Sequence, residues 1–258
     1  MFEPTLITFL IVCPLVFLAS FVDSVAGGGG IIAIPAYLMG GLPIHLAAGT
    51  NKVVAGIGLT VSTLKYRKSG KIRWTVALFA AAGSLPGGYV GAEIAKAMSD
   101  ALLSRIMLIV LPAVAVFLVI RRDLGREGAE KEMPTARKAL ISLAIGLGIG
   151  VYDGAIGPGT GTFMILCFSG FLAIDLVTAS GCAKVANLAS NIAAAISFIR
   201  GGYVVWKLAL PAVIFSILGN YCGAAYAVRG GSKKIRGMMF VVLGMLFVKL
   251  LCELITKN

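Results

Sequence analysis

The sequence predicts an all-α polytopic membrane protein, because of its composition, its long apolar stretches and two glycine-rich breaks. Of the 258 residues, 59% are hydrophobic and 13% are charged, whereas soluble domains have roughly 45–50% apolar and about 25% charged residues. The mean hydropathy is +0.96. The net charge of +12 comes from basic residues between apolar stretches, a pattern that sets orientation in a membrane and does not indicate nucleic-acid binding.

About eight membrane segments are expected along the chain. Uninterrupted apolar stretches reach the roughly 20 residues that cross about 30 Å of hydrocarbon. They are residues 45–64, 74–95, 101–120, 176–199, 207–228 and 236–255. Two further apolar regions, 6–39 and 139–172, contain the glycine-rich breaks. The five cysteines are scattered without a CxxC pair, so neither a disulfide framework nor a metal site is expected.

The two halves of the chain repeat an arrangement of residues that are rare in it. The matched residues lie about 130 positions apart and include Asp23 with Asp153, Lys52 with Lys184, and Trp74 with Trp206. We therefore predict two homologous four-segment repeats, at 1–120 and 139–258. The polar stretch 121–138 is expected to be the loop between them.

The interrupted regions allow two geometries. A continuous helix over residues 6–39 would be about 50 Å long, which is too long for one crossing. Each region therefore forms either a re-entrant hairpin or two short, tilted crossings. Hairpins leave three full crossings per half, which makes the repeats inverted, whereas two crossings make them parallel. The loop charges are similarly asymmetric either way, and we favour inverted repeats because they provide two-fold pseudo-symmetry around a site at the membrane midplane.

The breaks themselves predict a ligand site. They read FVDSVAGGGGIIAIP in the first half and VYDGAIGPGTGTFMI in the second. Unpaired backbone is not tolerated against lipid, and the first N–H groups of a short helix that follows a break carry partial positive charge. Two facing half-helix N-termini would therefore bind an anion, although glycines can also serve only close helix packing. The expected binding residues are Gly28, Gly29, Gly30, Ile31, Gly159, Thr160, Gly161 and Thr162.

Two lysines and two aspartates at matched positions of the two halves fall inside the predicted spans. Ionisable groups are costly in a bilayer and are functional candidates there. Lys52 and Lys184 lie roughly 10–13 Å into their spans, close to the expected depth of the breaks. Each lysine could pair with the aspartate of its own half, Asp23 or Asp153, and lock the broken helix. Alternatively, the lysines contact the anion and the aspartates, which would repel it, act as pairing or protonation partners.

The sixth expected segment, at 176–199, carries a polar stripe at helical spacing. Its members are Ser180, Lys184, Asn187 and Asn191. Such a stripe inside a membrane helix faces a bundle interior or a pathway. In the first half only Lys52 matches the stripe, with Asn51 beside it. We therefore add Asn51, Lys52, Lys184, Asn187 and Asn191 to the expected substrate-binding residues.

Several segments resemble the TauE/SafE family of sulfite and organosulfonate permeases. These are VDSVAGGGG, VYDGAIGPGTGTFM, the GTNK turn at 49–52, SGKIRW at 69–74 and RGGYVVW at 200–206. The resemblance covers almost the whole chain and implies two four-segment repeats in the plasma (inner) membrane. It also implies transport of a small sulfur-containing anion, such as sulfite or a short organosulfonate. These motifs specify the fold better than the cargo, since the family is broad.

The function expected from these features is secondary transport. An anion channel is the nearest alternative, because the same backbone sites could line a pore. An intramembrane enzyme would need a nucleophile with a base or a metal cluster, and a single histidine, His45, at the edge of a span does not supply one. The expected partners are an anionic substrate, the lipid bilayer and a proton coupled through an aspartate, with no cofactor, metal or nucleic acid. The oligomeric state, the particular anion and the direction of flux are not predicted.

Overall fold

The computed structural model describes residues 2–103, 105–106 and 133–256, with side chains described as far as residue 238. The expected segment 101–120 and the loop 121–138 therefore lie mostly outside the described residues. No strand occurs in the described ranges. The helices are α1 (Leu6–Ala26), α2 (Gly30–Met39), α3 (Ile44–Lys68), α4 (Trp74–Ala97), α6 (Thr135–Ala155), α7 (Thr160–Leu172), α8 (Leu176–Arg200) and α9 (Trp206–Thr256).

Within the described ranges, five helices are long and apolar enough to cross a membrane. These are α1, α4, α6, α8 and the Trp206–Met238 part of α9. The expectation of an all-helical membrane protein is confirmed, whereas the total of eight segments stays a prediction. The 25 residues of α3 would extend about 37 Å, but this helix is less apolar and buries Lys52 and several small polar residues. Its Ile57 and Leu64 side chains are exposed on the outside of the bundle.

The two predicted breaks are present where the glycines lie. In the first, α1 ends at Gly27, whose φ of 80° is left-handed. In the second, Gly157 and Gly159 have φ of 89° and 84° between α6 and α7. Glycine adopts this region of backbone space without the steric cost that a Cβ would impose. The sequence thus ends each long helix and starts a short one in the interior of the bundle.

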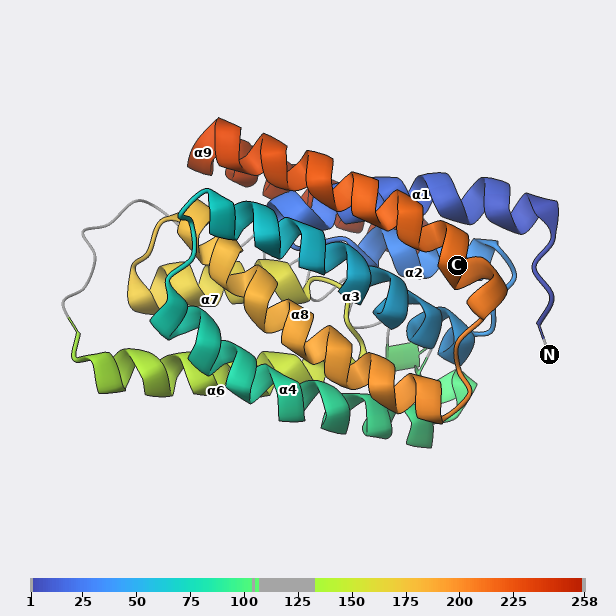
Figure 1. Cartoon of the computed structure of the whole chain (residues 1–258). Helices are drawn as coiled ribbons and strands as arrows, with labels where there is room; N and C mark the ends of the chain where they lie inside the picture. Colours follow the sequence, from blue (N-terminus) through green and yellow to red (C-terminus); the bar gives the residue numbers. More distant parts are fainter. Residues whose placement is uncertain (1, 104, 107–132, 257–258) are drawn as a thin grey trace.

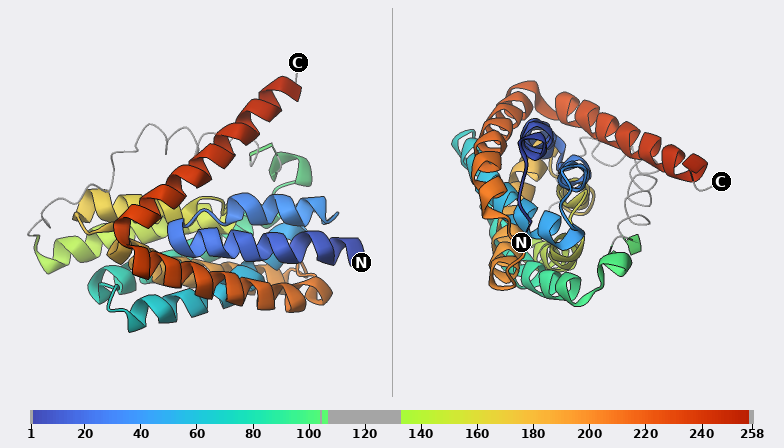
Figure 2. Two further views of the ribbon diagram at one scale, coloured as in Figure 1. Left: turned by 90° about the horizontal axis from the view of Figure 1, so that it is seen from above. Right: turned by 90° about the vertical axis from the view of Figure 1, so that its right-hand side faces the viewer.

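Each short helix folds back along the long helix that precedes it (Figures 1 and 2). The Thr8 hydroxyl near the start of α1 donates to the Gly40 carbonyl at the end of α2, at 3.1 Å, so the two ends of this hairpin lie together. The ring centroids of Tyr152 in α6 and Phe163 in α7 are 5.6 Å apart. The α1–α2 hairpin opens toward one end of the bundle, and the α6–α7 hairpin opens toward the other (Figure 1).

Glycines let the long helices pack with their backbones in contact. A Cβ on Gly87 of α4 would lie 2.6 Å from the Leu147 carbonyl oxygen of α6, and a Cβ on Gly219 of α9 would lie 2.3 Å from the Phe17 carbonyl oxygen of α1. These contacts pair α4 with α6 along one side of the bundle and α9 with α1 along the other, with α3 and α8 crossing between them (Figure 1). Small residues allow this close approach in membranes, where helix association depends on packing.

The long helix α9 bends once, at Gly231, where φ is 65° and ψ is −168°. Beyond this residue its backbone runs away from the bundle (Figure 2). The bend lies in the basic stretch 229–236, between the two segments expected at 207–228 and 236–255. The loop expected there is therefore a single glycine bend.

Substitutions at two glycines of α6 test whether the backbones of α4 and α6 are in contact. We expect Gly146→Ala to destabilise the protein by roughly 1–3 kcal/mol through overpacking, because its Cβ would lie 2.0 Å from the Ala80 carbonyl oxygen. Gly148→Ala is the matched control, since nothing lies within 4 Å of its Cβ position. Thermal unfolding midpoints in detergent should fall for the first variant only. Equal midpoints would show that α4 and α6 are not in backbone contact.

Candidate functional site

The two glycine breaks meet in the interior of the bundle. The Thr162 hydroxyl of α7 donates to the Ala26 carbonyl at 2.7 Å, and the Thr162 N–H donates to the Gly27 carbonyl at 3.3 Å. Gly27 and Gly161 are so close that a Cβ on Gly27 would lie 2.2 Å from the carbonyl carbon of Gly161. One break therefore supports the other, and both depend on the absence of side chains at these glycines.

Side chains from three other helices bind the buried end of α1. The last carbonyls of a helix have no partner within it. Here the acceptors and their donors are Asp23 with Lys184 Nζ, Ser24 with the Tyr66 hydroxyl, Val25 with the Ser180 hydroxyl and Ala26 with the Thr162 hydroxyl. Part of the polar stripe of α8 thus has a structural role, since Ser180 and Lys184 stabilise the broken end of α1.

The intramembrane charges form ion pairs between the two halves. Lys52 Nζ lies 2.9 Å from Asp153 Oδ1, and Lys184 Nζ lies 3.3 Å from Asp23 Oδ2. The expected pairing of each lysine with the aspartate of its own half is wrong. The reason is that each hairpin tip points at the lysine-bearing helix of the other half. The crossed pairs compensate all four charges and tie each break to the opposite half of the chain.

The two aspartates have different surroundings. Asp153 also accepts hydrogen bonds from the Ser190 hydroxyl at 2.7 Å and from Asn191 Nδ2 at 3.1 Å, and its side chain is 4% exposed. Asp23 accepts a longer bond of 3.3 Å from the Gly29 N–H, and its side chain is 17% exposed. Asp153 is therefore locked in place, whereas Asp23 is held loosely at the start of α2.

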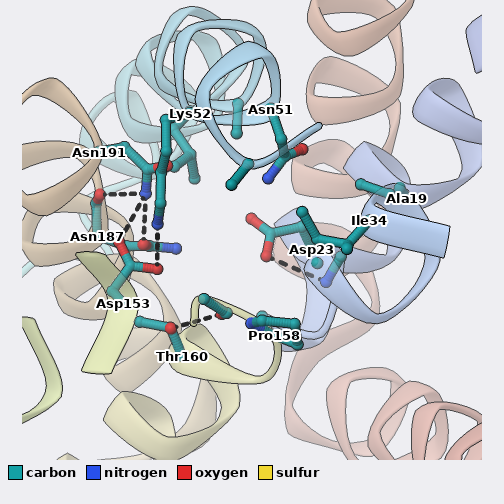
Figure 3. A pocket seen from close by; sticks show the side chains of 18 of the residues that line it. Ala19, Asp23, Ile34, Asn51, Lys52, Asp153, Pro158, Thr160, Asn187 and Asn191 are labelled. Atoms are coloured by element: carbon teal, nitrogen blue, oxygen red, sulfur yellow. Dashed lines mark hydrogen bonds and ion pairs between the residues drawn. The ribbon is translucent and has the colours of Figure 1, made fainter. Parts of the chain in front are cut away.

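A pocket lies between the breaks and α3, α8 and α9 (Figure 3). The expected site residues that line it are Asp23, Gly29, Gly30, Asn51, Lys52, Asp153, Thr160, Asn187 and Asn191. Those outside its lining are Gly28, Ile31, Gly159, Gly161, Thr162 and Lys184. The pocket therefore collects residues from both breaks and from both lysine-bearing regions, with Asp23 and Asn51 on one side and Lys52, Asp153 and Asn187 on the other.

Sequence reasoning missed the contribution of α9 to this pocket. Asn220 lines it, together with Ser20 of α1. Asn220 is 2% exposed, and its Nδ2 donates to the Ser216 carbonyl at 3.0 Å. A serine and an asparagine four residues apart in an apolar helix are a short polar stripe, the same signal that identified α8. With only two members, this stripe was too short to be recognised.

Hydrogen bonds fix the direction of the amides on the α8 side of the pocket. A carboxylate only accepts, so Asn191 presents Nδ2 to Asp153 and also donates from it to Asn187 Oδ1 at 2.8 Å. Asn187 must then turn its own Nδ2 the other way, and Figure 3 shows this nitrogen pointing into the pocket. Lys52 and the start of α7 at Thr160 lie beside it. This side therefore combines the Asn187 donor, the Lys52–Asp153 ion pair and the partial positive charge of a helix N-terminus.

The chain matches the family model described as "Sulfite exporter TauE/SafE" over residues 12–250. It belongs to the TauE/SafE sulfite exporter family. TauE/SafE relatives include the "Probable membrane transporter protein ORF9" of Sinorhizobium sp, which is 33% identical over 96% of this chain and 93% of that protein. A "Probable membrane transporter protein" of Haemophilus influenzae is 32% identical over 92% of each chain. No solved structure matches this TauE/SafE chain.

This membership agrees with the described fold. The relative YfcA of Escherichia coli, also named a probable membrane transporter protein, is 30% identical over 92% of this chain and 87% of its own length. The family and these relatives are membrane transporters, not enzymes. Together with the five helices able to span a bilayer, they identify this TauE/SafE protein as a multi-pass integral protein of the plasma membrane.

Proposed function

We propose that the protein is a secondary transporter that binds a small sulfur-containing anion, such as sulfite or a short organosulfonate, in the pocket between the two breaks. The observation that carries this proposal is the oriented donor surface of Lys52, Asn187 and the α7 N-terminus. Preorganised donors of this kind favour an anion, because they need no rearrangement when it arrives. The sulfur class comes from the family name.

The residues of the proposed site divide by their position. Direct contacts with the anion are assigned to the predicted residues that line the pocket, other than the aspartates, namely Gly29, Gly30, Asn51, Lys52, Thr160, Asn187 and Asn191. The residues that support the breaks from outside the lining are Gly28, Ile31, Gly159, Gly161, Thr162 and Lys184. Asp23 and Asp153 act as pairing or protonation partners, since their charge repels an anion.

We propose further that residues 1–120 and 139–258 are inverted repeats around this pocket. Equivalent contacts support the symmetry: a Cβ on Gly49 would meet the Tyr203 carbonyl oxygen at 2.2 Å, and a Cβ on Gly181 would meet the Lys71 carbonyl oxygen at 1.9 Å. The two ion pairs are also equivalent, because each joins the lysine of one half to the aspartate of the other half. Inverted repeats allow alternating access when one half rocks against the other about a fixed site.

Membrane topology tests the inversion. Lys68, at the end of α3, and Arg200, at the end of α8, are equivalent exposed positions at opposite ends of the bundle. In a cysteine-free background, Lys68→Cys and Arg200→Cys should react with an impermeant thiol reagent from opposite sides of the membrane. We expect Lys68→Cys to face the cytoplasm, because the α3–α4 connection is basic and basic loops stay inside. Labelling from the same side would establish parallel halves.

Flux measurements test the transport function itself. Purified protein in liposomes should take up sulfite, thiosulfate or a C2–C3 sulfonate with saturation, and internal unlabelled anion should accelerate entry of labelled anion. Such counter-transport requires a carrier whose site alternates between the two sides. Currents far above carrier turnover, without counter-transport, would instead establish an anion channel. Absence of flux for every anion of this panel would remove the sulfur-anion assignment.

A further inference from the structure

The α1–α9 side of the pocket contains a buried acceptor that lacks a donor. Asn220 Oδ1 has no hydrogen-bond partner among the described residues, although the residue is 2% exposed. Its Nδ2 is already used by the Ser216 carbonyl, so an exchange of its amide atoms would break that bond. Buried polar groups are normally paired. This buried oxygen belongs to a residue that lines the pocket, and it lacks a partner that would bring a proton or a positive charge.

The carboxylate of Asp23 belongs to the same side of the pocket. Ser24, the next residue, donates from its hydroxyl to the Asn220 carbonyl at 3.0 Å, which places Asn220 beside this turn of α1. The two partners of the Asp23 carboxylate, Lys184 Nζ and the Gly29 N–H, each lie at 3.3 Å. Asp153 has closer partners and less exposure. Asp23 is thus the more exposed and less tightly held of the two aspartates.

The charges around Asp23 favour a proton when an anion is present. The titratable groups that face it or share its pocket are Lys184 of α8, Tyr66 and Lys52 of α3, and Asp153 of α6. From α9, the neutral Ser216 and Asn220 bond Ser20 and Ser24, which are neighbours of Asp23 in α1. From α2, the Gly29 N–H donates to Asp23 itself. Two lysines and two aspartates leave the site neutral. A bound anion adds uncompensated negative charge inside the bilayer, and one proton on Asp23 removes one unit of it.

We propose that Asp23 is the proton-binding residue of the transport cycle and that Asn220 Oδ1 accepts the hydrogen bond of its protonated carboxyl. This inference rests on the proposed anion-carrier function. When ionised, Asp23 occupies the N-terminus of α2 through the Gly29 N–H, as a tethered anion would. Protonation weakens this hold, frees the N-terminus for the substrate and supplies the donor that Asn220 lacks. Proton and anion are thereby bound together.

The proton site is tested by infrared difference spectroscopy on the full chain in lipid. Beside the bands of surface carboxyls, a pH change should produce the carbonyl stretch of a buried protonated carboxyl in the wild type, and Asp23→Asn should abolish this component. Asn220→Ala should move the midpoint of this band by about one pH unit toward acid, a roughly tenfold loss of proton affinity for one lost hydrogen bond. Asn187→Ala, on the other side of the pocket, is the control that leaves the midpoint unchanged. A band that persists in Asp23→Asn overturns the proposal.

The coupling to the anion is tested with isethionate, a C2 sulfonate whose charge is constant across the pH range. At fixed pH, isethionate should increase the band in the wild type, and its affinity for Asp23→Asn should no longer depend on pH. Wild-type affinity that is independent of pH overturns the coupling, as does an Asp23→Asn variant with the wild-type pH profile. An Asp23 band in a protein that binds neither isethionate nor sulfite would support the proton site and overturn the proposed function instead.

Discussion

Replacement of Lys52 by alanine is expected to abolish transport and to destabilise the fold by about 3–5 kcal/mol, the usual effect of breaking a buried ion pair. Lys52 Nζ is 2.9 Å from Asp153 Oδ1, and both side chains are nearly inaccessible. Without the lysine, an uncompensated carboxylate stays inside the membrane with only the neutral donors Ser190 and Asn191. Thermal unfolding and tracer flux in liposomes measure the two effects.

Two control variants separate the effect of breaking the buried ion pair from an unspecific loss of folding or flux. Lys207→Ala removes a lysine from an exposed pair with Glu3, and exposed pairs contribute little, so folding and flux should stay close to wild type. The double variant Lys52→Met with Asp153→Leu removes both buried charges and should recover part of the lost stability. It should not recover flux, because the donor surface is gone. Wild-type flux in Lys52→Ala would exclude this lysine from the site.

Conversion of Asn187 to aspartate is expected to weaken anion binding by about 100-fold or more. The side chain keeps its size, but an N–H donor aimed into the pocket becomes a negative charge. A hydrogen bond to a charged group contributes about 1.5–3 kcal/mol, and a factor of ten in affinity corresponds to about 1.4 kcal/mol. Repulsion adds to this loss. Equilibrium binding of sulfite or isethionate to purified variants measures the change.

Two further variants distinguish the contact of Asn187 with the anion from the effect of Asn191 on the orientation of Asn187. Asn187→Ala removes the donor without adding charge and should weaken binding by roughly tenfold. Asn191→Ala removes the amide that fixes the direction of Asn187, so it should weaken binding at constant fold even where Asn191 makes no contact with the anion. If Asn187→Asp bound the anion as tightly as the wild type, the donor surface would not be the site.

The features predicted from the sequence were those with a local signal. Runs of glycine beside Asp23 and Asp153 located both breaks, and helical spacing located Asn187 and Asn191 on the pocket wall. Which residues become partners across the bundle has no such local signal in the sequence. Which lysine meets which aspartate depends on how the hairpins cross, so the pairing within each half was a reasonable expectation but wrong.

The difference between the two halves could also be predicted only in part from the sequence. The sequence showed that the polar stripe of α8 is missing from α3, which predicted an asymmetric site. It did not show that Ser180 and Lys184 bind the end of α1, because that role requires the two breaks to meet in space. The sulfur specificity of the substrate did not follow from any residue and rests on the resemblance to the family.

The central claim is that the anion lies in the pocket where the two breaks meet, and a structure with bound selenite tests it most directly. Selenite is the heavier analogue of sulfite, and its selenium gives an anomalous signal that marks its position. We predict one strong peak between the two breaks, within hydrogen-bond distance of Lys52 Nζ and Asn187 Nδ2, and its loss in Asn187→Asp. A peak found only elsewhere in the protein, or one unchanged in Asn187→Asp, would contradict the claim.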